Sequence, residues 1–508
     1  MAAGLAGSAA VTLTAAVVHA FVPDIRFLPF AIAQSLIRAA PGGFATYFIE
    51  ALGHWAMRLA VVGTSAAFLL SGAVVGLFAP RLERIARGSD VAAWIAGFLA
   101  LWGAAVGLYP ADSVSATRPA FALATLPLYL FGGGVAVAVF RRLLVPTKPW
   151  EGRPSLGRRY VLRSLWVGSL GLLLGAADFS RLIDRTPDPG LRALAVPGLR
   201  DLLPPAESPS DEAFDAIPGL SPEITSNGSF YVVDEEILDP IVDPATWRLG
   251  VRGKVRRPLS LTHDELLRLP LQERFQTLEC ISNEVGGELI STAKWIGVPL
   301  PSLLERAGLD RSAVEVVFTA TSGYADSLSI DQAMDESTWI AVGMNDRVLP
   351  RAHGFPARLL SVGTYGMKNP KWLVDIEVVD APFTGYWERR GWSKAARVKT
   401  GSRIDAPAPY SSVRGPVTVA GVAFSGDRGI SMVEVSIDGG RTWQSADLKR
   451  HLSSLSWRLW RLRWTPSGPG STILQVRAYD GAGVMQPAIG AEPHPDGASG
   501  YHAIKVDH

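Results

Sequence analysis

Long apolar stretches dominate the first third of the chain. Four of them carry no charged side chain: residues 1–23, 59–79, 91–109 and 119–140. A helix needs roughly 18–20 apolar residues to cross a bilayer, and each stretch approaches or exceeds that length. The pattern predicts an N-terminal α-helical membrane domain over residues 1–180, in contact with membrane lipid. Residues 24–53 are ambiguous and could form an interfacial helix.

A shorter apolar stretch follows a basic segment. Ser164–Ala177 directly follows Gly157–Arg163, which contains Arg158 and Arg159. This arrangement resembles a twin-arginine export signal, although two arginines before a helix are also typical of simple cytoplasmic anchors. The stretch could be cleaved or stay as a fifth anchor. Both interpretations, together with the basic connections 80–90 and 141–163, predict a multi-pass protein of the cell membrane whose catalytic domain is extracytoplasmic.

The pattern changes after the apolar region. Residues 181–229 are rich in proline and serine, which predicts a linker. Alternating residues then predict strands at Trp247–Val255, Val314–Thr319 and Trp372–Val379. Short helices are expected after Thr262 and over Pro299–Ala307. Because no β-α-β repetition is evident, we expect an irregular α+β domain over residues 230–404.

Strands separated by turn residues fill the last hundred positions. Val417–Val422, Met432–Ile437 and Ser471–Tyr479 alternate with period two, and turns such as Asp438–Gly440 separate them. This spacing predicts an immunoglobulin-like β-sandwich over residues 405–508. Four tryptophans are candidate core residues: Trp443, Trp457, Trp460 and Trp464. The fold class expected from the whole sequence is therefore multidomain.

Composition narrows the function classes. The chain has 508 residues, of which 48% are hydrophobic and 19% charged, and a net charge of +2. These values exclude a disordered protein and give no reason to expect a nucleic-acid partner. The single cysteine, Cys280, excludes an intrachain disulfide framework and a zinc site of several cysteines. By itself it is either a small buried hydrophobic residue or a thiolate that serves as nucleophile or metal ligand.

Longer motifs resemble a known family. The run from Thr277 to Leu300, which includes Cys280, is similar to the cofactor-ligand segment of the sulfite oxidase family of molybdopterin oxidoreductases. His353–Arg358 and Gly366–Leu373 are similar to its pterin-binding signature. Val435–Gly440 resembles part of its C-terminal dimerisation domain. The resemblance covers roughly residues 225–400 and continues into the predicted sandwich.

The resemblance implies a molybdenum-molybdopterin cofactor with Cys280 as the protein ligand of the metal. A soft thiolate suits such a metal, and cationic side chains suit the phosphate of the pterin. The implied cofactor-binding residues are Tyr231, Asp234, His353, Arg358, Asn369, Pro370 and Lys371. Trp392 stands where the family has its active-site tyrosine, so it is a candidate catalytic residue together with Cys280.

Several positions depart from the family's sulfite-oxidising members. Glu284-Val285 stands where they have an arginine after the cysteine, and Val233-Asp234-Glu235 replaces Arg-Asn-His. The family's mid-segment aspartate has no clear counterpart near Thr319–Gly323. Losing cations and gaining carboxylates repels a dianion. We therefore expect sulfite to be a poor substrate and the true small-molecule substrate to be neutral or cationic.

The electron route is open at this point. The chain has no Cys-x-x-Cys-His motif and no cysteines for an iron–sulfur cluster. His19 and His54, at similar predicted depth, could bind a b-type haem or quinone, although two interfacial histidines need have no such role. An external electron carrier is the other expectation.

Together these features predict a membrane-anchored oxidoreductase that catalyses two-electron oxo transfer outside the cytoplasm. A homodimer is expected from the sandwich. One alternative is a reductase of sulfoxides with the same fold. Another is a non-catalytic membrane receptor with a degenerate molybdopterin domain, against which the retained Cys280 argues.

Overall fold

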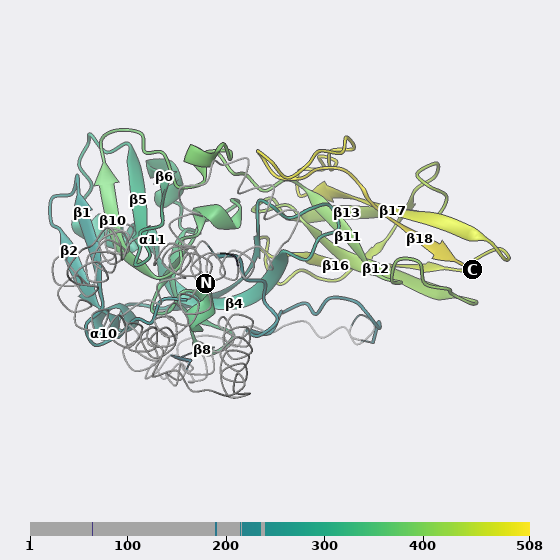
Figure 1. Ribbon diagram of the computed structural model, residues 1–508, viewed down its shortest axis with the longest axis horizontal. Helices are drawn as coiled ribbons and strands as arrows, with labels where there is room; N and C mark the ends of the chain where they lie inside the picture. Colours follow the sequence, from purple (N-terminus) through teal and green to yellow (C-terminus); the bar gives the residue numbers. More distant parts are fainter. Residues whose placement is uncertain (1–62, 64–187, 190–213, 215, 235–238) are drawn as a thin grey trace, which may run out of the picture. The chain divides into compact units, whose positions relative to one another are not determined.

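The computed structural model describes residues 63, 188–189, 214, 216–234 and 239–508 (Figure 1). Asp188–Glu235 and Asp239–His508 form one compact unit. The four predicted spans, Ser164–Ala177, the arginine pair at 158–159, His19 and His54 lie outside the described residues.

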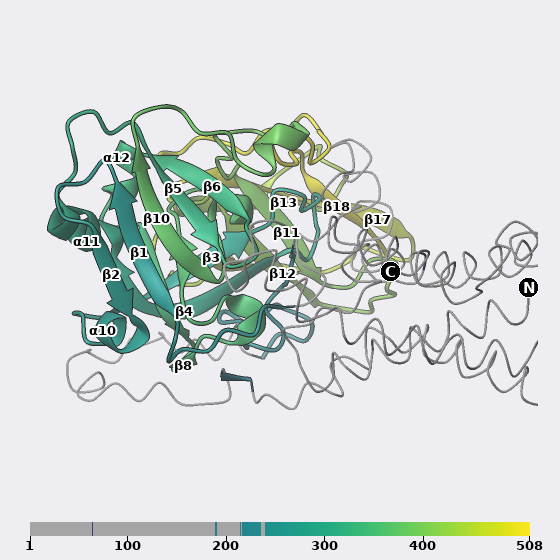
Figure 2. The same ribbon diagram turned by 60° about the vertical axis from the view of Figure 1, so that its left-hand side comes forward.

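The N-terminal half of this unit contains two sheets, of which the first has five strands. Its strand order is β2-β1-β10-β5-β6, with β1 and β10 parallel and the other neighbours antiparallel (Figure 2). The strands are β1 (Arg248–Gly253), β2 (Leu259–Thr262), β5 (Glu315–Ala320), β6 (Ala325–Ser329) and β10 (Leu373–Val379).

A second sheet carries the segment that contains Cys280. Its order is β3-β4-β7-β8, and β9 also pairs with β7. The strands are β3 (Gln272–Glu279), β4 (Ile290–Pro299), β7 (Trp339–Met344), β8 (Arg347–Val348) and β9 (Arg358–Leu360). β3 and β4 form an antiparallel pair from Gln272↔Gly297 to Glu279↔Ile290, which leaves Cys280 at the start of the connecting loop.

Three short α-helices occur in the described part: α10 (His263–Leu267), α11 (Leu300–Ala307) and α12 (Ile330–Ala333). Thr262 caps α10 through a capping box with Glu265, as its sequence predicts. α11 buries Leu300, Leu303 and Leu304. These leucines join a core with apolar residues of both sheets, including Phe318 and Ile340.

Three 3₁₀ turns contain or adjoin candidate site residues, namely His353, Asn369 and Trp392. They are η2 (Arg351–His353), η3 (Gly366–Lys368) and η4 (Glu388–Arg390).

Two four-stranded sheets form the C-terminal part, with orders β11-β12-β16-β15 and β14-β13-β17-β18 (Figure 1). The strands are β11 (Gly401–Ala406), β12 (Val417–Phe424), β13 (Ile430–Ser436), β14 (Gln444–Ser445), β15 (Asp447–Leu448), β16 (Arg458–Trp464), β17 (Ser471–Asp480) and β18 (His502–Asp507). Trp460 and Trp464 share a core with residues of both sheets. Trp457 is also buried. Trp443 is only half-buried and packs against Arg477 and Tyr501, so its assignment to the core is wrong.

The predicted fold class is wrong. In the part of the chain that the structure describes, no helix is long and apolar enough to cross a membrane. The molybdopterin-type part, expected to be α+β, is mostly β, because its helices have five, eight and four residues. Helices this short cover little of a sheet, so the two sheets and their loops supply most of the core.

Candidate functional site

Cys280 lies at the end of β3, at the start of the loop to β4. Its backbone N–H donates to the Leu289 carbonyl at 2.9 Å, and Asn283 N–H donates to the Cys280 carbonyl at 3.0 Å. The Sγ atom lies 3.0 Å from Ser282 Oγ, and the residue is 9% exposed. Burial raises the pKa of the thiol. A thiol whose pKa is raised by burial is neutral at pH 7, which disfavours a role as a free nucleophile.

Tyr231 lies near both Cys280 and Arg358. Burial raises the pKa of Tyr231 well above its ordinary value, and the charges of Cys280 and Glu279 raise it further while Arg358 opposes them. The Tyr231 hydroxyl also approaches η3: a Cβ built on Gly366 would lie 2.9 Å from it. These contacts place the thiol, the phenol and η3 together.

Arg358 connects several predicted cofactor-binding residues. Its guanidinium donates to the His353 carbonyl at 3.1 Å and to the Asn369 carbonyl at 3.4 Å, and it lies 5.2 Å from the centre of the Trp295 ring. Its Nε is buried and has no hydrogen-bond partner among the described residues. Burial lowers the pKa of Arg358 to about 10. A buried guanidinium with unused donor capacity is suited to an anion.

His353 ends η2 and is 3% exposed. Its Nε2 is 2.8 Å from the Asn227 carbonyl, so Nε2 carries the proton and donates it there. Burial lowers the pKa of His353 to about 4. The neutral ring therefore uses its proton within the protein, and donation to a phosphate requires protonation or a different orientation of the ring.

Lys371 and Asp234 form an ion pair from segments far apart in the sequence. The Lys371 ammonium also donates to the Ala352 carbonyl at 2.9 Å and lies 4.5 Å from the centre of the Trp372 ring. Burial lowers the pKa of Lys371 to about 7.

Asn369 and Pro370 serve the local structure. Asn369 Oδ1 accepts from Ser361 N–H at 2.7 Å, and its Nδ2 donates to the Tyr365 carbonyl at 3.0 Å. The Pro370 carbonyl accepts from Leu359 N–H at 3.0 Å. Both residues fix the backbone between η3 and Lys371. The Asn369 side chain is used in these hydrogen bonds, and the Pro370 side chain has no hydrogen-bond donor.

The donor set fits a molybdopterin cofactor. A buried thiol at one side is the soft ligand that such a metal requires. Arg358 and Lys371, whose positive charges burial disfavours, are the groups whose charge a phosphate would stabilise. The unsatisfied Nε of Arg358 supplies an available donor.

Trp392 occupies a different cluster from Arg358 and Lys371. It packs with Ile281, Tyr365 and Met367, and its ring contacts that of His494 with centres 5.1 Å apart. The indole is 6% exposed, and its Nε1 has no hydrogen-bond partner among the described residues. Trp392 therefore borders the Cys280 segment through Ile281, and its catalytic role stays a prediction.

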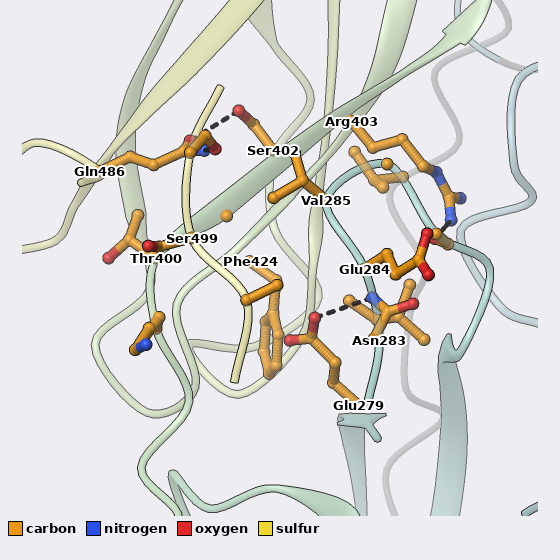
Figure 3. Close-up of a pocket in the computed structure, with 18 of the residues that line it drawn as sticks. Glu279, Asn283, Glu284, Val285, Thr400, Ser402, Arg403, Phe424, Gln486 and Ser499 are labelled. Carbon is orange, nitrogen blue, oxygen red and sulfur yellow. Dashed lines mark hydrogen bonds between the residues drawn. The ribbon is translucent and has the colours of Figure 1, made fainter. Parts of the chain in front are cut away.

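A pocket lies between the loop after Cys280 and the C-terminal strands (Figure 3). Two kinds of residues line it. Glu279 ends β3, and Asn283, Glu284 and Val285 come from the loop that follows, whereas Lys399, Thr400, Ser402, Arg403, Gln486 and Ser499 come from the C-terminal part.

The charged side chains that line this pocket differ in the groups that bind them. Arg403 is bound to Asp405 at 2.6 Å and to the Gly287 carbonyl at 2.6 Å, and Lys399 donates to the Gly497 carbonyl at 2.6 Å. Glu279 accepts from the Asn283 amide at 2.9 Å, and burial raises its pKa to about 7. Two carboxyl groups thus face the pocket, while its cations are held by other groups.

The contribution of the C-terminal part to this pocket was not predicted from the sequence. A buried cluster of Asp326, Lys368 and Glu388 was not predicted either. Asp326 lies on β6, a few residues beyond the segment searched for a mid-segment aspartate.

Comparisons with known proteins agree with this geometry. An oxidoreductase molybdopterin binding domain matches residues 237–387, and a Mo-co oxidoreductase dimerisation domain matches residues 396–493. Mitochondrial sulfite oxidase of Homo sapiens is 33% identical over 313 residues, which cover 52% of this chain and 57% of that protein. The chain thus spans little more than half the length of this relative.

Two further proteins are similar. The catalytic subunit MsrP of the protein-methionine-sulfoxide reductase of Burkholderia mallei is 29% identical over 244 residues, covering 44% of this chain and 69% of that protein. The crystal structure of the sulfane dehydrogenase SoxCD from Paracoccus pantotrophus has a TM-score of 0.51 at 25% identity and covers 56% of this chain and 81% of that chain.

The predicted family is therefore confirmed by two domain matches in the expected order, by curated relatives and by a solved structure. Residues 237–493 thus carry, in the expected order, the two domains of a molybdopterin-dependent oxidoreductase of the sulfite oxidase type.

Proposed function

We propose that this protein binds molybdenum-molybdopterin and catalyses two-electron oxo transfer on a small molecule. The observation that carries the proposal is the buried Cys280 thiol near Tyr231, together with the buried Arg358, which also lies near Tyr231, and the buried ammonium of Lys371. The two matched domains support it independently.

The residues have distinct roles in this proposal. When bound, the cofactor supplies the two-electron oxo-transfer chemistry at molybdenum. Cys280 holds the metal as a thiolate, because coordination to a cation removes the proton that burial otherwise keeps on the thiol. Arg358 and Lys371 hold the phosphate, and the Asp234 carboxylate orients the Lys371 ammonium.

The pocket beside the loop after Cys280, which Cys280 itself does not line, favours a neutral or cationic substrate. Glu279 and Glu284 line it and Val285 adds no charge, while Asp405 offsets the charge of Arg403 and the Gly497 carbonyl holds the Lys399 ammonium. A dianion meets repulsion in such a partly dry site. We expect sulfite to be turned over inefficiently, and a kcat/KM above ~10⁶ M⁻¹s⁻¹, the range of efficient enzymes, would refute this.

Reduction of sulfoxides is the second candidate function. The similarity to a protein-methionine-sulfoxide reductase catalytic subunit favours it, and a neutral sulfoxide suits the pocket. Turnover of methionine sulfoxide with a reduced dye, without turnover of sulfite with an oxidised dye, would select this direction.

The location and the partners are a further part of the proposal. We propose that the catalytic part works outside the cytoplasm at the cell membrane, on the basis of Arg158-Arg159 and the apolar stretch after it. Electrons would be exchanged with quinone or an external carrier, and His19 and His54 remain candidates for a quinone or b-type haem site. The dimerisation domain supports a homodimer.

Metal analysis tests the central proposal. Wild type purified from a host that makes the cofactor should contain about one molybdenum per chain, and Cys280→Ser should contain much less or show a changed Mo(V) spectrum. A folded wild-type protein without molybdenum or pterin would contradict the proposal and favour the receptor alternative.

A further inference from the structure

Three charged side chains are buried together at the turn Gly366–Lys371, which supplies part of the predicted cofactor cradle (His353, Arg358, Asn369, Pro370 and Lys371). Lys368 Nζ lies 2.6 Å from Asp326 Oδ1 and 2.6 Å from Glu388 Oε1. The three side chains are 3%, 1% and 5% exposed, respectively. Lys368 also donates to the Ser327 carbonyl at 3.2 Å. The cluster therefore joins β6, η3 and η4 at one ammonium group.

The turn that carries Lys368 also carries predicted cofactor-binding residues. Asn369 and Lys371 follow η3 directly. At the other end of η3, Gly366 lies close to two groups. A Cβ atom built on Gly366 would be 2.9 Å from the Tyr231 hydroxyl and 3.4 Å from the Glu279 carbonyl oxygen. The turn is thus held against the Cys280 segment at its start and against β6 and η4 at its end.

Further contacts fix the same turn. The Tyr324 hydroxyl donates to the Met367 carbonyl at 2.6 Å and lies 3.5 Å from Asp326 Oδ2. Gly385 approaches Asp326 closely, because a Cβ there would lie 2.8 Å from the carboxylate carbon. A side chain at position 385 would therefore push η4 away from the cluster.

Stability alone is a poor reason for this arrangement. Two carboxylates and one ammonium leave a net negative charge in a nearly dry site, and burial raises the pKa of Asp326 to about 6. Apolar residues of similar volume often serve as well or better for stability. A buried ionic cluster instead fixes direction, because three elements must meet at one nitrogen.

We propose that Lys368 is a positioning residue that holds the turn Gly366–Lys371 in place, so that Asn369 and Lys371 keep their positions in the cofactor cradle. The inference rests on the proposed function, because it requires that the cradle binds the pterin. Lys368 acts through the turn and does not itself contact the cofactor.

Pterin retention tests the role. Lys368→Met keeps the length of the side chain and removes its charge, and Lys368→Arg keeps the charge. The matched control is Lys449→Met, since Lys449 is equally buried at 3% and pairs with Glu223 at 2.9 Å in the C-terminal part. Each intact protein is purified from a cofactor-producing host, and pterin and molybdenum are measured per folded chain.

The expected result is at least a fivefold loss of pterin in folded Lys368→Met, at least half of the wild-type content in Lys368→Arg, and no loss in Lys449→Met. Wild-type pterin content in folded Lys368→Met would overturn the proposal. Equal loss in Lys449→Met would also overturn it, because the effect would then follow from any buried lysine.

A second variant covers the case in which Lys368→Met does not fold. The triple variant Lys368→Met/Asp326→Asn/Glu388→Gln removes all three charges and leaves no unpaired ion. It should fold and still lose pterin at least fivefold, and full retention would overturn the proposal. Absence of pterin from wild type would instead contradict the proposed function itself, so the two failures are distinguishable.

Discussion

Gly286 offers a sharp test of how the C-terminal part shapes the pocket. The residue lies in the loop after Cys280 with φ +80°, and a Cβ there would lie 2.3 Å from His502 Cδ2 and 2.4 Å from Nε2. The ring cannot move freely, because its Nδ1 accepts a hydrogen bond from Ile404 N–H at 3.0 Å. Gly286→Ala should therefore combine backbone strain with a steric clash.

The two contributions can be separated. A non-glycine residue in the left-handed region costs about 1–2 kcal/mol, and overpacking costs about 1–3 kcal/mol, so we expect a loss of about 2–5 kcal/mol. Gly483→Ala is the matched control, since Gly483 has φ +79° and a Cβ there would meet nothing within 4 Å. It should lose only the backbone part. In Gly286→Ala/His502→Ala the clash is absent, so about 1–3 kcal/mol should return relative to additivity.

Urea unfolding of the intact chain, followed by tryptophan fluorescence, measures these free energies. The same variants are assayed for KM, which should rise in Gly286→Ala because Glu284 and Val285 move, while molybdenum content stays near wild type. Additive effects of the Gly286→Ala and His502→Ala changes would refute the reasoning. A Gly286→Ala loss equal to that of Gly483→Ala would refute it as well.

Two other predictions concern charge. His353 has a pKa of about 4 in the folded protein against an ordinary 6.5, so the unfolded chain binds the proton first as pH falls. In cofactor-free protein, the stability of wild type relative to His353→Asn should be complete above pH 6.5 and fall by about 3 kcal/mol toward pH 4; a constant difference in urea unfolding from pH 7 to pH 4 would contradict this. Val285→Arg places a cation in the pocket and should lower KM for sulfite about tenfold. The matched variant Val285→Gln should not, and equal KM values for the two would remove the electrostatic account of substrate choice.

Local patterns in the sequence determined much of this protein. Period-two alternation predicted the main strands, and Thr262 marked the start of α10, because side-chain direction and capping depend on neighbours a few residues away. The single cysteine and the run His353–Arg358 indicated the family before any contact was known. The fold class was wrong nonetheless: the apolar stretches read as membrane helices lie outside the described residues, and the rest is mostly β.

Only the tertiary structure decided which distant residues meet. Lys368 and Asp326 are 42 residues apart in the sequence, yet the Lys368 Nζ atom lies 2.6 Å from Asp326 Oδ1. Arg403 and Gly287 are 116 residues apart, yet the Arg403 guanidinium lies 2.6 Å from the Gly287 carbonyl oxygen. No periodicity records such contacts, because they depend on how sheets and loops pack after the local elements have formed. The pKa of His353 and the partial exposure of Trp443 are likewise not recorded in the sequence pattern, because packing sets the surroundings of both side chains. The sequence thus determined which chemical groups are present, and the packing determined which of them are buried, paired or turned toward the pocket.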